Sequence, residues 1–171
     1  MDPSANSAHP AIEMNVDRSS PAHSGFAPHG VYKSRFERAL VCNDATGPFN
    51  VELLQAFAKT SDAFYAEVAA RGPYVLLTTF HGSMMMSPEA IAMVRALVLR
   101  LRDRGEAMVA CAHAVAPDVE GRELMGDVYV GIYAGAGIPY RMFDDEETAR
   151  VWLFEQLAES DNFPPGRPKE N

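Results

Sequence analysis

Two residues with reactive side chains, Cys111 and His113, stand two positions apart in the apolar segment "AMVACAHAVA". In a strand this spacing places both side chains on the same face, where a thiol and an imidazole could act as a nucleophile and its base. The surrounding residues are apolar, and no Asp or Asn is identifiable as the group that would orient the imidazole. A small hydrolase is therefore the least favoured function, and we expect the protein not to be an enzyme.

A further histidine, His81, follows the apolar segment "YVLLTTF". If the two apolar strands pair in parallel, His81 could neighbour His113. Asp118 or Glu120 could then complete a metal site, since His and carboxylate groups are common metal ligands. Histidines brought together by chance outnumber such sites, so we predict no metal and no cofactor.

The segment "HGSMMMSPEA" joins a predicted strand to a predicted helix. Ser87, Pro88 and Glu89 have the residue types of an N-cap and the first two helical positions. The same helix end would stabilise a phosphate group through free amides and the helix dipole. Ser87 is therefore a candidate phosphoacceptor, with Ser83 as a weaker candidate, although capping alone also explains Ser87.

The same loop contains three consecutive methionines, Met84, Met85 and Met86, after His81 and Gly82. Flexible thioether side chains on an exposed loop suit an adaptable partner surface or an apolar ligand. On a loop that turns inward they would instead fill a gap above the sheet. We predict an interaction or ligand loop here and keep core filling as the alternative.

Hydrophobic periodicity predicts the elements that position these residues. Asn50 is expected to cap the first helix, and Gly72 with Pro73 to end it. The third helix should bury a stripe of Leu124, Val128 and Ile132. The predicted strands cover residues 34–42, 74–80, 107–116 and 140–143, and the predicted helices cover 51–71, 88–104, 118–137 and 144–160.

The last predicted helix begins in the acidic run "DDEETARVWLFEQLAES". Asp144 and Glu147 have the spacing of a capping box. Ala149, Leu153 and Leu157 form its apolar stripe.

Alternation of strands and helices predicts an α/β fold with a four-stranded sheet, mostly parallel or mixed, and about four helices. The continuous apolar segments 74–80 and 107–116 are expected to be buried neighbouring strands. Loops that carry function gather beyond the carboxyl ends of parallel strands. The segments "FHGSMMMSPE" and "HAVAPDVEGRE" should therefore meet at one edge of the sheet.

Composition narrows the function classes. The chain has 171 residues, a net charge of -8 and no cluster of Lys and Arg, which argues against nucleic-acid binding. Two cysteines are too few for a disulfide framework and favour the cytoplasm. We expect no signal peptide and no membrane-spanning helix, because no apolar segment is long enough.

The order of these segments, from "GPFN" through the Ser-capped helix to "IPYRMFDDEETARVWL", resembles a STAS domain, the fold of anti-sigma-factor antagonists. The resemblance covers about residues 31–160 and is closest to stand-alone STAS-like bacterial proteins. It implies a non-enzymatic interaction module whose partner is a kinase or an anti-sigma-like regulator. It also places the phosphorylated serine of the antagonists at Ser87, although "MMMSPEA" lacks their acidic residue and glycine.

The predicted organisation is a disordered N-terminal tail at 1–30, a STAS-like domain at 31–160 and a flexible tail at 161–171. Both tails lack hydrophobic periodicity and contain several prolines. The function favoured by the sequence is a cytoplasmic protein-interaction module switched by phosphorylation. The alternative is a domain that binds a small apolar or lipid-like molecule.

Overall fold

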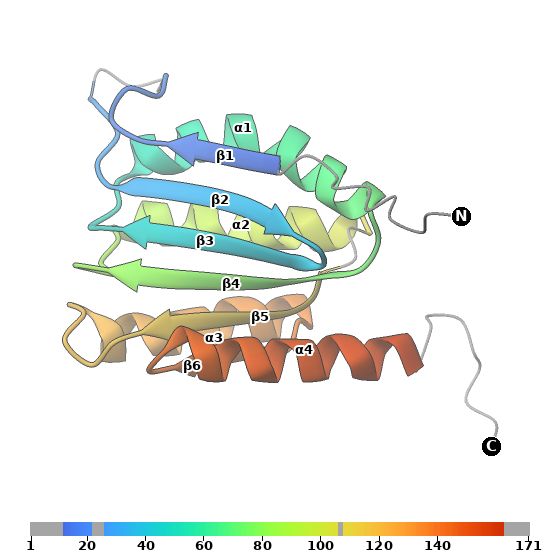
Figure 1. Ribbon diagram of the computed structural model, residues 1–171. Coiled ribbons are helices and arrows are strands. Elements are labelled where there is room, and N and C mark those ends of the chain that lie inside the picture. The colour runs from blue at the N-terminus through green and yellow to red at the C-terminus, as the bar shows by residue number, and fades with distance from the viewer. Residues whose placement is uncertain (1–11, 22–25, 106–107, 163–171) are drawn as a thin grey trace, which may run out of the picture.

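One mixed sheet with helices on both faces organises the chain in the computed structural model, which describes residues 12–21, 26–105 and 108–162 (Figure 1). Within these residues there are six strands and four helices. In chain order they are β1 (Ile12–Val16), β2 (Val31–Glu37), β3 (Leu40–Thr46), α1 (Val51–Ala70), β4 (Tyr74–His81), α2 (Pro88–Asp103), β5 (Met108–Val115), α3 (Arg122–Ala136), β6 (Tyr140–Phe143) and α4 (Glu146–Asn162).

The strand order in the sheet, β1-β2-β3-β4-β5-β6, is the same as the order along the chain. β1, β2 and β3 pair antiparallel, whereas β3, β4, β5 and β6 pair in parallel. This confirms the predicted α/β class, the mixed sheet and the parallel pairing of the two most apolar strands. The sheet has six strands rather than the four predicted.

The sheet separates the core into two layers, one against each set of helices. Figure 1 shows α1, α2 and α3 behind the sheet and α4 in front of it. The larger cluster of buried side chains includes residues of α1, α2 and α3, and the smaller one lies between α4 and strands β3 to β6. Among the described helices, none combines the length and apolar character that crossing a bilayer requires.

One of the additional strands comes from residues 34–42, which we predicted as a single strand. They belong to a hairpin, because β2 ends at Glu37 and β3 begins at Leu40. Arg38 makes the turn with a φ of 58°, a left-handed conformation that residues other than Gly rarely adopt. The turn contains no Gly, Pro, Asn or Asp and therefore has none of the residues that usually mark a turn.

The other additional strand, β1, lies inside the predicted N-terminal tail. Ile12, Met14 and Val16 are buried, while Glu13 and Asn15 are exposed. This alternation is that of a strand with one buried face, but five residues were too few to stand out in a polar segment. The tail prediction is thus wrong for residues 12–16, and residues 1–11 and 22–25 lie outside the described part of the chain.

At the other end of the chain, α4 continues to Asn162, so the predicted tail at 161–171 begins inside a helix. The remainder of that tail, residues 163–171, lies outside the described residues. The predicted stripe of α4 is confirmed, because Ala149 and Leu153 are buried and Leu157 packs against the same cluster.

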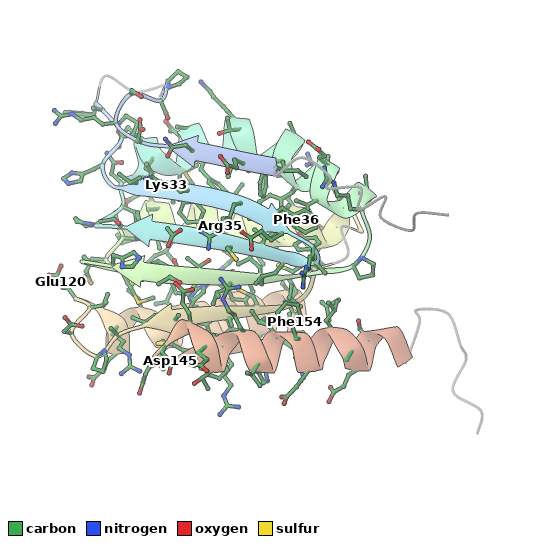
Figure 2. The ribbon with its side chains drawn as sticks, viewed as in Figure 1. Lys33, Arg35, Phe36, Glu120, Asp145 and Phe154 are labelled. Carbon is green, nitrogen blue, oxygen red and sulfur yellow. The ribbon has the colours of Figure 1, made fainter. Side chains whose placement is uncertain are left out.

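The cap of α4 differs from the prediction. Asp145, rather than Asp144, accepts hydrogen bonds from the backbone amide of Thr148 at 2.8 Å and from its hydroxyl at 3.0 Å, and it lies at the start of α4 (Figure 2). These hydrogen bonds from Thr148 lower the pKa of Asp145. Asp144 instead pairs with Arg122 at the start of α3. In a run of two aspartates the sequence alone does not distinguish which one is the cap.

The apolar stripe predicted for α3 is confirmed in part. Ile132 is buried and Val128 packs against the larger cluster, but Leu124 is 63% exposed. The buried face also includes Met125, Tyr129 and Tyr133, which the predicted stripe did not contain.

Candidate functional site

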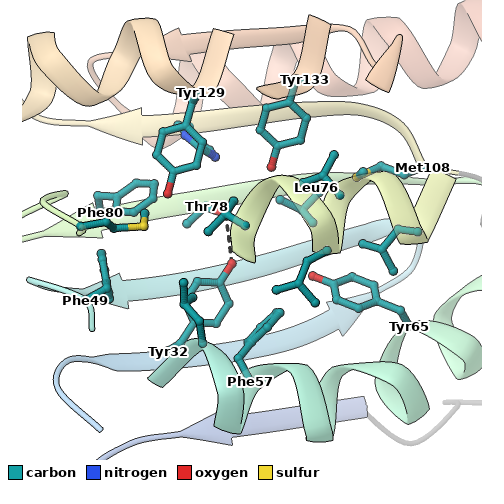
Figure 3. A pocket seen from close by; sticks show the side chains of 17 residues that line it. Tyr32, Phe49, Phe57, Tyr65, Leu76, Thr78, Phe80, Met108, Tyr129 and Tyr133 are labelled. Atoms are coloured by element: carbon teal, nitrogen blue, oxygen red, sulfur yellow. Dashed lines mark hydrogen bonds between the residues drawn. The ribbon is translucent and has the colours of Figure 1, made fainter. Parts of the chain in front are cut away.

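A cavity of about 90 Å³ lies between the sheet and the three helices behind it (Figure 3). Its wall is mainly aromatic and aliphatic, and the described residues that line it include no Asp, Glu, Lys or Arg. α2 contributes Val94, Leu97, Val98 and Leu101. Val98 and Leu101 are buried, whereas Val94 and Leu97 are partly exposed, so these two side chains separate part of the cavity from solvent.

Polar side chains form a row across the sheet on the side of this cavity. Ser34 of β2, Asn43 of β3, Thr78 of β4 and His113 of β5 are consecutive partners in the strand register. Partners in register project from the same face of a sheet. All four side chains are at most 3% exposed. Four buried polar groups in neighbouring strands need hydrogen-bond partners, because an unpaired buried polar group destabilises the fold.

The centre of the row is only partly satisfied. The Asn43 side-chain amide donates to Thr78 Oγ1 at 3.1 Å, and the Tyr32 hydroxyl lies 3.5 Å from the same oxygen. Asn43 Oδ1 and Ser34 Oγ are buried without a hydrogen-bond partner. Thr78 and Tyr32 both line the cavity, whereas Asn43 does not, so the unpaired carbonyl group belongs to a side chain that lies behind Thr78 in the second layer of the wall.

Four tyrosines surround the same space. In Figure 3, the hydroxyl groups of Tyr32, Tyr65, Tyr129 and Tyr133 point inward from β2, α1 and α3. Burial raises the pKa of Tyr65, Tyr129 and Tyr133 well above the ordinary value. For Tyr65, hydrogen bonding with Asn43 opposes this effect. The hydroxyls therefore stay protonated at neutral pH and offer neutral hydrogen-bonding groups.

His113 is enclosed by aromatic rings. Its ring centre is 4.4 Å from that of Tyr129 and 5.0 Å from that of Phe80, both in edge-to-face geometry. Its Nδ1 atom lies 3.0 Å from the Tyr140 hydroxyl. Burial lowers the pKa of His113 from 6.5 to about 3, so the imidazole is neutral at physiological pH. His113 is thus a neutral polar group in the cavity wall.

The predicted proximity of Cys111 and His113 is confirmed in one respect, since both project from β5 toward the same helices. Burial raises the pKa of Cys111 to about 12. The group is therefore a thiol at neutral pH, whereas the thiolate is the nucleophile. The arrangement therefore lacks the reactive thiolate that a cysteine hydrolase uses as its nucleophile.

His81 does not approach His113. Thr78 is the partner of His113 in the register, and His81 lies beside Thr46 at the end of β4. His81 is exposed on the opposite face of the sheet, 3.7 Å from Asp44. Over the described residues, no group of three or more His, Cys, Asp and Glu side chains could hold a metal ion.

The predicted loop between β4 and α2 does meet the loop after β5. Met84 N donates to Glu120 O at 2.8 Å, and Glu120 N donates to Gly82 O at 3.0 Å. Gly82 turns the chain here with a φ of +68°. The expectation that the two loops share the carboxyl edge of the parallel strands is confirmed.

Within this loop the candidate residues differ in accessibility. Ser87 caps α2 as predicted, because its Oγ accepts from Ala90 N at 3.2 Å, and its side chain is half-buried. Ser83 is 3% exposed, and its Oγ accepts from Met85 N at 3.1 Å. A kinase could not reach Ser83 in this conformation.

The methionines mainly fill the core. Met84 is fully buried, and Met85 and Met86 are partly buried against the larger cluster. Met86 lines the cavity and pairs with Phe49 through an isolated bridge. The alternative of core filling is therefore the better description of Met84, whereas Met86 belongs to the cavity wall.

Sequence reasoning missed the polar row itself. Thr78 stands inside the apolar strand β4, and a polar residue in a buried strand is a signal of an internal hydrogen bond or a ligand. Asn43 follows directly after the predicted strand 34–42, so it was not assigned to a strand. Recognising that Asn43 and Thr78 are neighbours requires the register of β3 against β4, which the sequence does not specify. Comparison of the chain with protein-family models, with curated proteins and with solved structures finds no match.

Proposed function

We propose that this protein binds a small, mostly apolar molecule in the cavity between the sheet and helices α1, α2 and α3. The observation that carries the proposal is an aromatic cavity whose wall includes two members of the buried polar row, Thr78 and His113, with Asn43 directly behind Thr78. Ligand sites are typically apolar cavities with a few polar groups that orient the ligand. A cavity that served only packing would not need a buried amide with a carbonyl oxygen left unpaired.

The volume limits the ligand to one ring or a short chain. An apolar cavity of about 150 Å³ can hold benzene. The cavity here is smaller, about 90 Å³, so a single ring would enter only if the lining side chains move outward to enlarge it. The half-buried residues of α2, such as Leu97, are the part of the wall best able to make those shifts.

The test measures binding of toluene to the purified chain. Thermal unfolding and protein NMR are the two readouts. A ligand that binds only the folded state stabilises it by about 2.7 kcal/mol at a concentration of 100 times Kd. For a protein of this size, that energy corresponds to a rise of about 5–10 °C in Tm. Absence of any rise, and of any shift in the signals of the lining residues, would count against the proposal.

A matched pair of variants in α2 localises the binding. Leu97 lines the cavity, whereas Leu99 packs elsewhere on the same helix, and both are half-buried. Leu97→Phe should fill part of the cavity and abolish the effect of toluene. Leu99→Phe should keep it. Equal binding by the two variants would place the ligand somewhere else.

A second candidate is the interaction module that the STAS-like resemblance implies. The observation that favours it is the position of Ser87, half-buried at the first turn of α2. Phosphorylation there would add about two negative charges at the N-terminus of a helix and alter binding of a protein partner, such as a kinase or an anti-sigma-like regulator. Both cysteines are free thiols, in keeping with a cytoplasmic location.

The test of this second candidate is mass spectrometry of the native protein for a phosphopeptide that contains Ser87. Partner recovery is then compared between Ser87→Ala and Ser87→Asp. A phosphopeptide with different partners for the two variants supports the module. An unmodified peptide with identical partners removes it.

A further inference from the structure

We infer that the ligand of this cavity is a neutral ring molecule with one hydrogen-bond donor, and that Asn43 Oδ1 accepts this hydrogen bond beside Thr78. The inference rests on the proposed function, because it identifies the class of molecule that the same cavity would bind. It follows from the hydrogen bonds of the row, from the charge of the lining and from the arrangement of the rings.

The hydrogen bonds leave one acceptor unmet behind the cavity wall, on a side chain that is bonded to the lining residue Thr78. One amide hydrogen of Asn43 is donated to Thr78 Oγ1, and Asn43 also acts on Tyr65 as a donor, because hydrogen bonding with Asn43 lowers the pKa of the Tyr65 hydroxyl. The carbonyl oxygen of the same amide has no partner. Asn43 is 2% exposed, so bulk solvent does not supply one. A buried carbonyl oxygen without a partner costs about 1–3 kcal/mol, which a ligand donor would recover.

Thr78 and Tyr65 define the route to this oxygen. Both contact the Asn43 amide and both line the cavity. Figure 3 shows Thr78 and the Tyr65 hydroxyl directed toward the interior of the cavity. A donor group of a bound molecule would therefore reach Asn43 between these two side chains, while its apolar body stays among the aromatic rings.

The uncharged wall of the cavity disfavours a charged ligand. Among the described lining residues there is no Asp, Glu, Lys or Arg, and His113 is neutral because burial lowers its pKa. The tyrosine hydroxyls are protonated for the same reason. An ion in this space would lose its hydration without gaining a counter-charge, which is strongly unfavourable.

The rings favour an aromatic body over an aliphatic one. Tyr129 meets His113 edge to face, and Tyr129 and Tyr133 lie nearly parallel, with their planes at 23°. Offset and edge-to-face contacts between aromatic rings contribute beyond the burial of area alone. A single phenol-like ring combines this geometry with one neutral O–H donor.

The experiment compares three probes on the wild-type chain at pH 7: 4-methylphenol, 4-methylanisole and toluene. They share the methylated ring, and only 4-methylphenol has a donor. We expect 4-methylphenol to bind about tenfold more tightly than 4-methylanisole, as one hydrogen bond to a buried acceptor implies. The side-chain amide signals of Asn43 should shift in NMR spectra with 4-methylphenol only.

Variants then assign the preference to a residue. Asn43→Leu should bind toluene as before and lose the tenfold preference for 4-methylphenol. Ser34→Ala is the matched control, since Ser34 belongs to the same buried row but its side chain makes no hydrogen bond to a residue of the cavity wall. It should behave as wild type. If Asn43→Leu does not fold, the NMR shift of Asn43 in the wild-type chain decides the question.

The outcomes separate the two proposals. Equal affinity for 4-methylphenol and toluene, with no shift at Asn43, overturns the assigned donor but leaves an apolar binding site. Absence of binding for all three probes overturns both. A tenfold preference that survives in Asn43→Leu moves the acceptor to another residue and contradicts the role of Asn43.

Discussion

Asn43 donates its side-chain amide to Thr78 Oγ1 across the parallel pair β3 and β4, at 3.1 Å, and keeps its own carbonyl oxygen without a partner. The pair is buried between the sheet and the helices, so the arrangement is both a stabilising contact and an unmet acceptor. It joins the two antiparallel hairpin strands to the parallel part of the sheet through a side chain.

A double-mutant cycle should detect this coupling. Thr78→Val leaves the buried Asn43 amide without its acceptor and should lower the free energy of unfolding by about 1–3 kcal/mol. Asn43→Leu removes donor and unpaired carbonyl together and should lower it less. The double variant should be more stable than the sum of the two losses predicts, as measured by urea unfolding. Additive effects within about 0.5 kcal/mol would mean that the hydrogen bond contributes nothing.

His113 should make the protein sensitive to mild acid. Burial lowers its pKa from 6.5 to about 3, so below pH 6.5 the unfolded chain binds a proton that the folded chain does not. The free energy of unfolding should therefore decrease as the pH falls from 6.5 toward 3, by about 1.4 kcal/mol per pH unit. Above pH 6.5 the imidazole is neutral in both the folded and the unfolded chain, so its titration no longer changes the free energy of unfolding.

The measurement for His113 is urea unfolding at pH 7, 6 and 5. His113→Gln should show a smaller decrease between pH 6 and pH 5 than the wild type, whatever its stability at pH 7. His81→Gln is the control, because His81 is exposed. A wild-type slope in His113→Gln would show that His113 does not titrate as its burial implies.

The two thiols should be unreactive in the folded protein. Cys42 and Cys111 are free and buried, and burial raises the pKa of both. For Cys42 the neighbouring Arg150 opposes the shift. With a colorimetric disulfide reagent at pH 8, fewer than one thiol per chain should react within minutes. In guanidinium chloride both should react, and rapid modification of Cys111 in the native state would contradict its burial.

The two serines of the loop after β4 should respond differently to an acidic residue. Ser87→Ala should lower the free energy of unfolding by about 1 kcal/mol through loss of the N-cap of α2, whereas Ser87→Asp keeps a capping oxygen and should have little effect. Ser83→Asp places a charge at a buried position and should destabilise by several kcal/mol. Chemical denaturation provides the comparison, and equal losses for Ser83→Asp and Ser87→Asp would contradict their assigned environments.

β1 should contribute to stability although it is short. Met14→Ala removes a buried side chain from the larger cluster and should lower the free energy of unfolding by about 2 kcal/mol or more. Asn15→Ala changes the adjacent exposed position and should have an effect below about 0.5 kcal/mol. Equal stability of the two variants would mean that the strand is not held against the sheet in solution.

Sequence patterns predicted the elements with strong local signals. The caps of α1 and α2, at Asn50 and Ser87, depend only on neighbouring residues and were found. The apolar segments of β4 and β5 were recognised because buried parallel strands have no polar alternation. The hairpin at Arg38 and the strand around Met14 were missed, because the first has no turn residue and the second is short.

The cavity was less predictable than the fold. Thr78 in its wall and Asn43 behind it come from strands that α1 separates in sequence, and their contact depends on the register between those strands. The buried face of α3 depends on which side of the helix packs on the sheet, and Tyr129 proved to face inward where Leu124 was expected. Local sequence patterns specify neither the register between two strands nor the side of a helix that packs on the sheet.

The sheet has its strands in the same order as the chain, so every pairing joins segments that are consecutive in the sequence. A polypeptide leaving the ribosome could therefore complete the β1–β2–β3 meander first and then extend the sheet at a single growing edge, one strand at a time. Because no later strand has to insert between two earlier ones, assembly needs no rearrangement of what has already formed. α4, made last, then covers the front of the final strands.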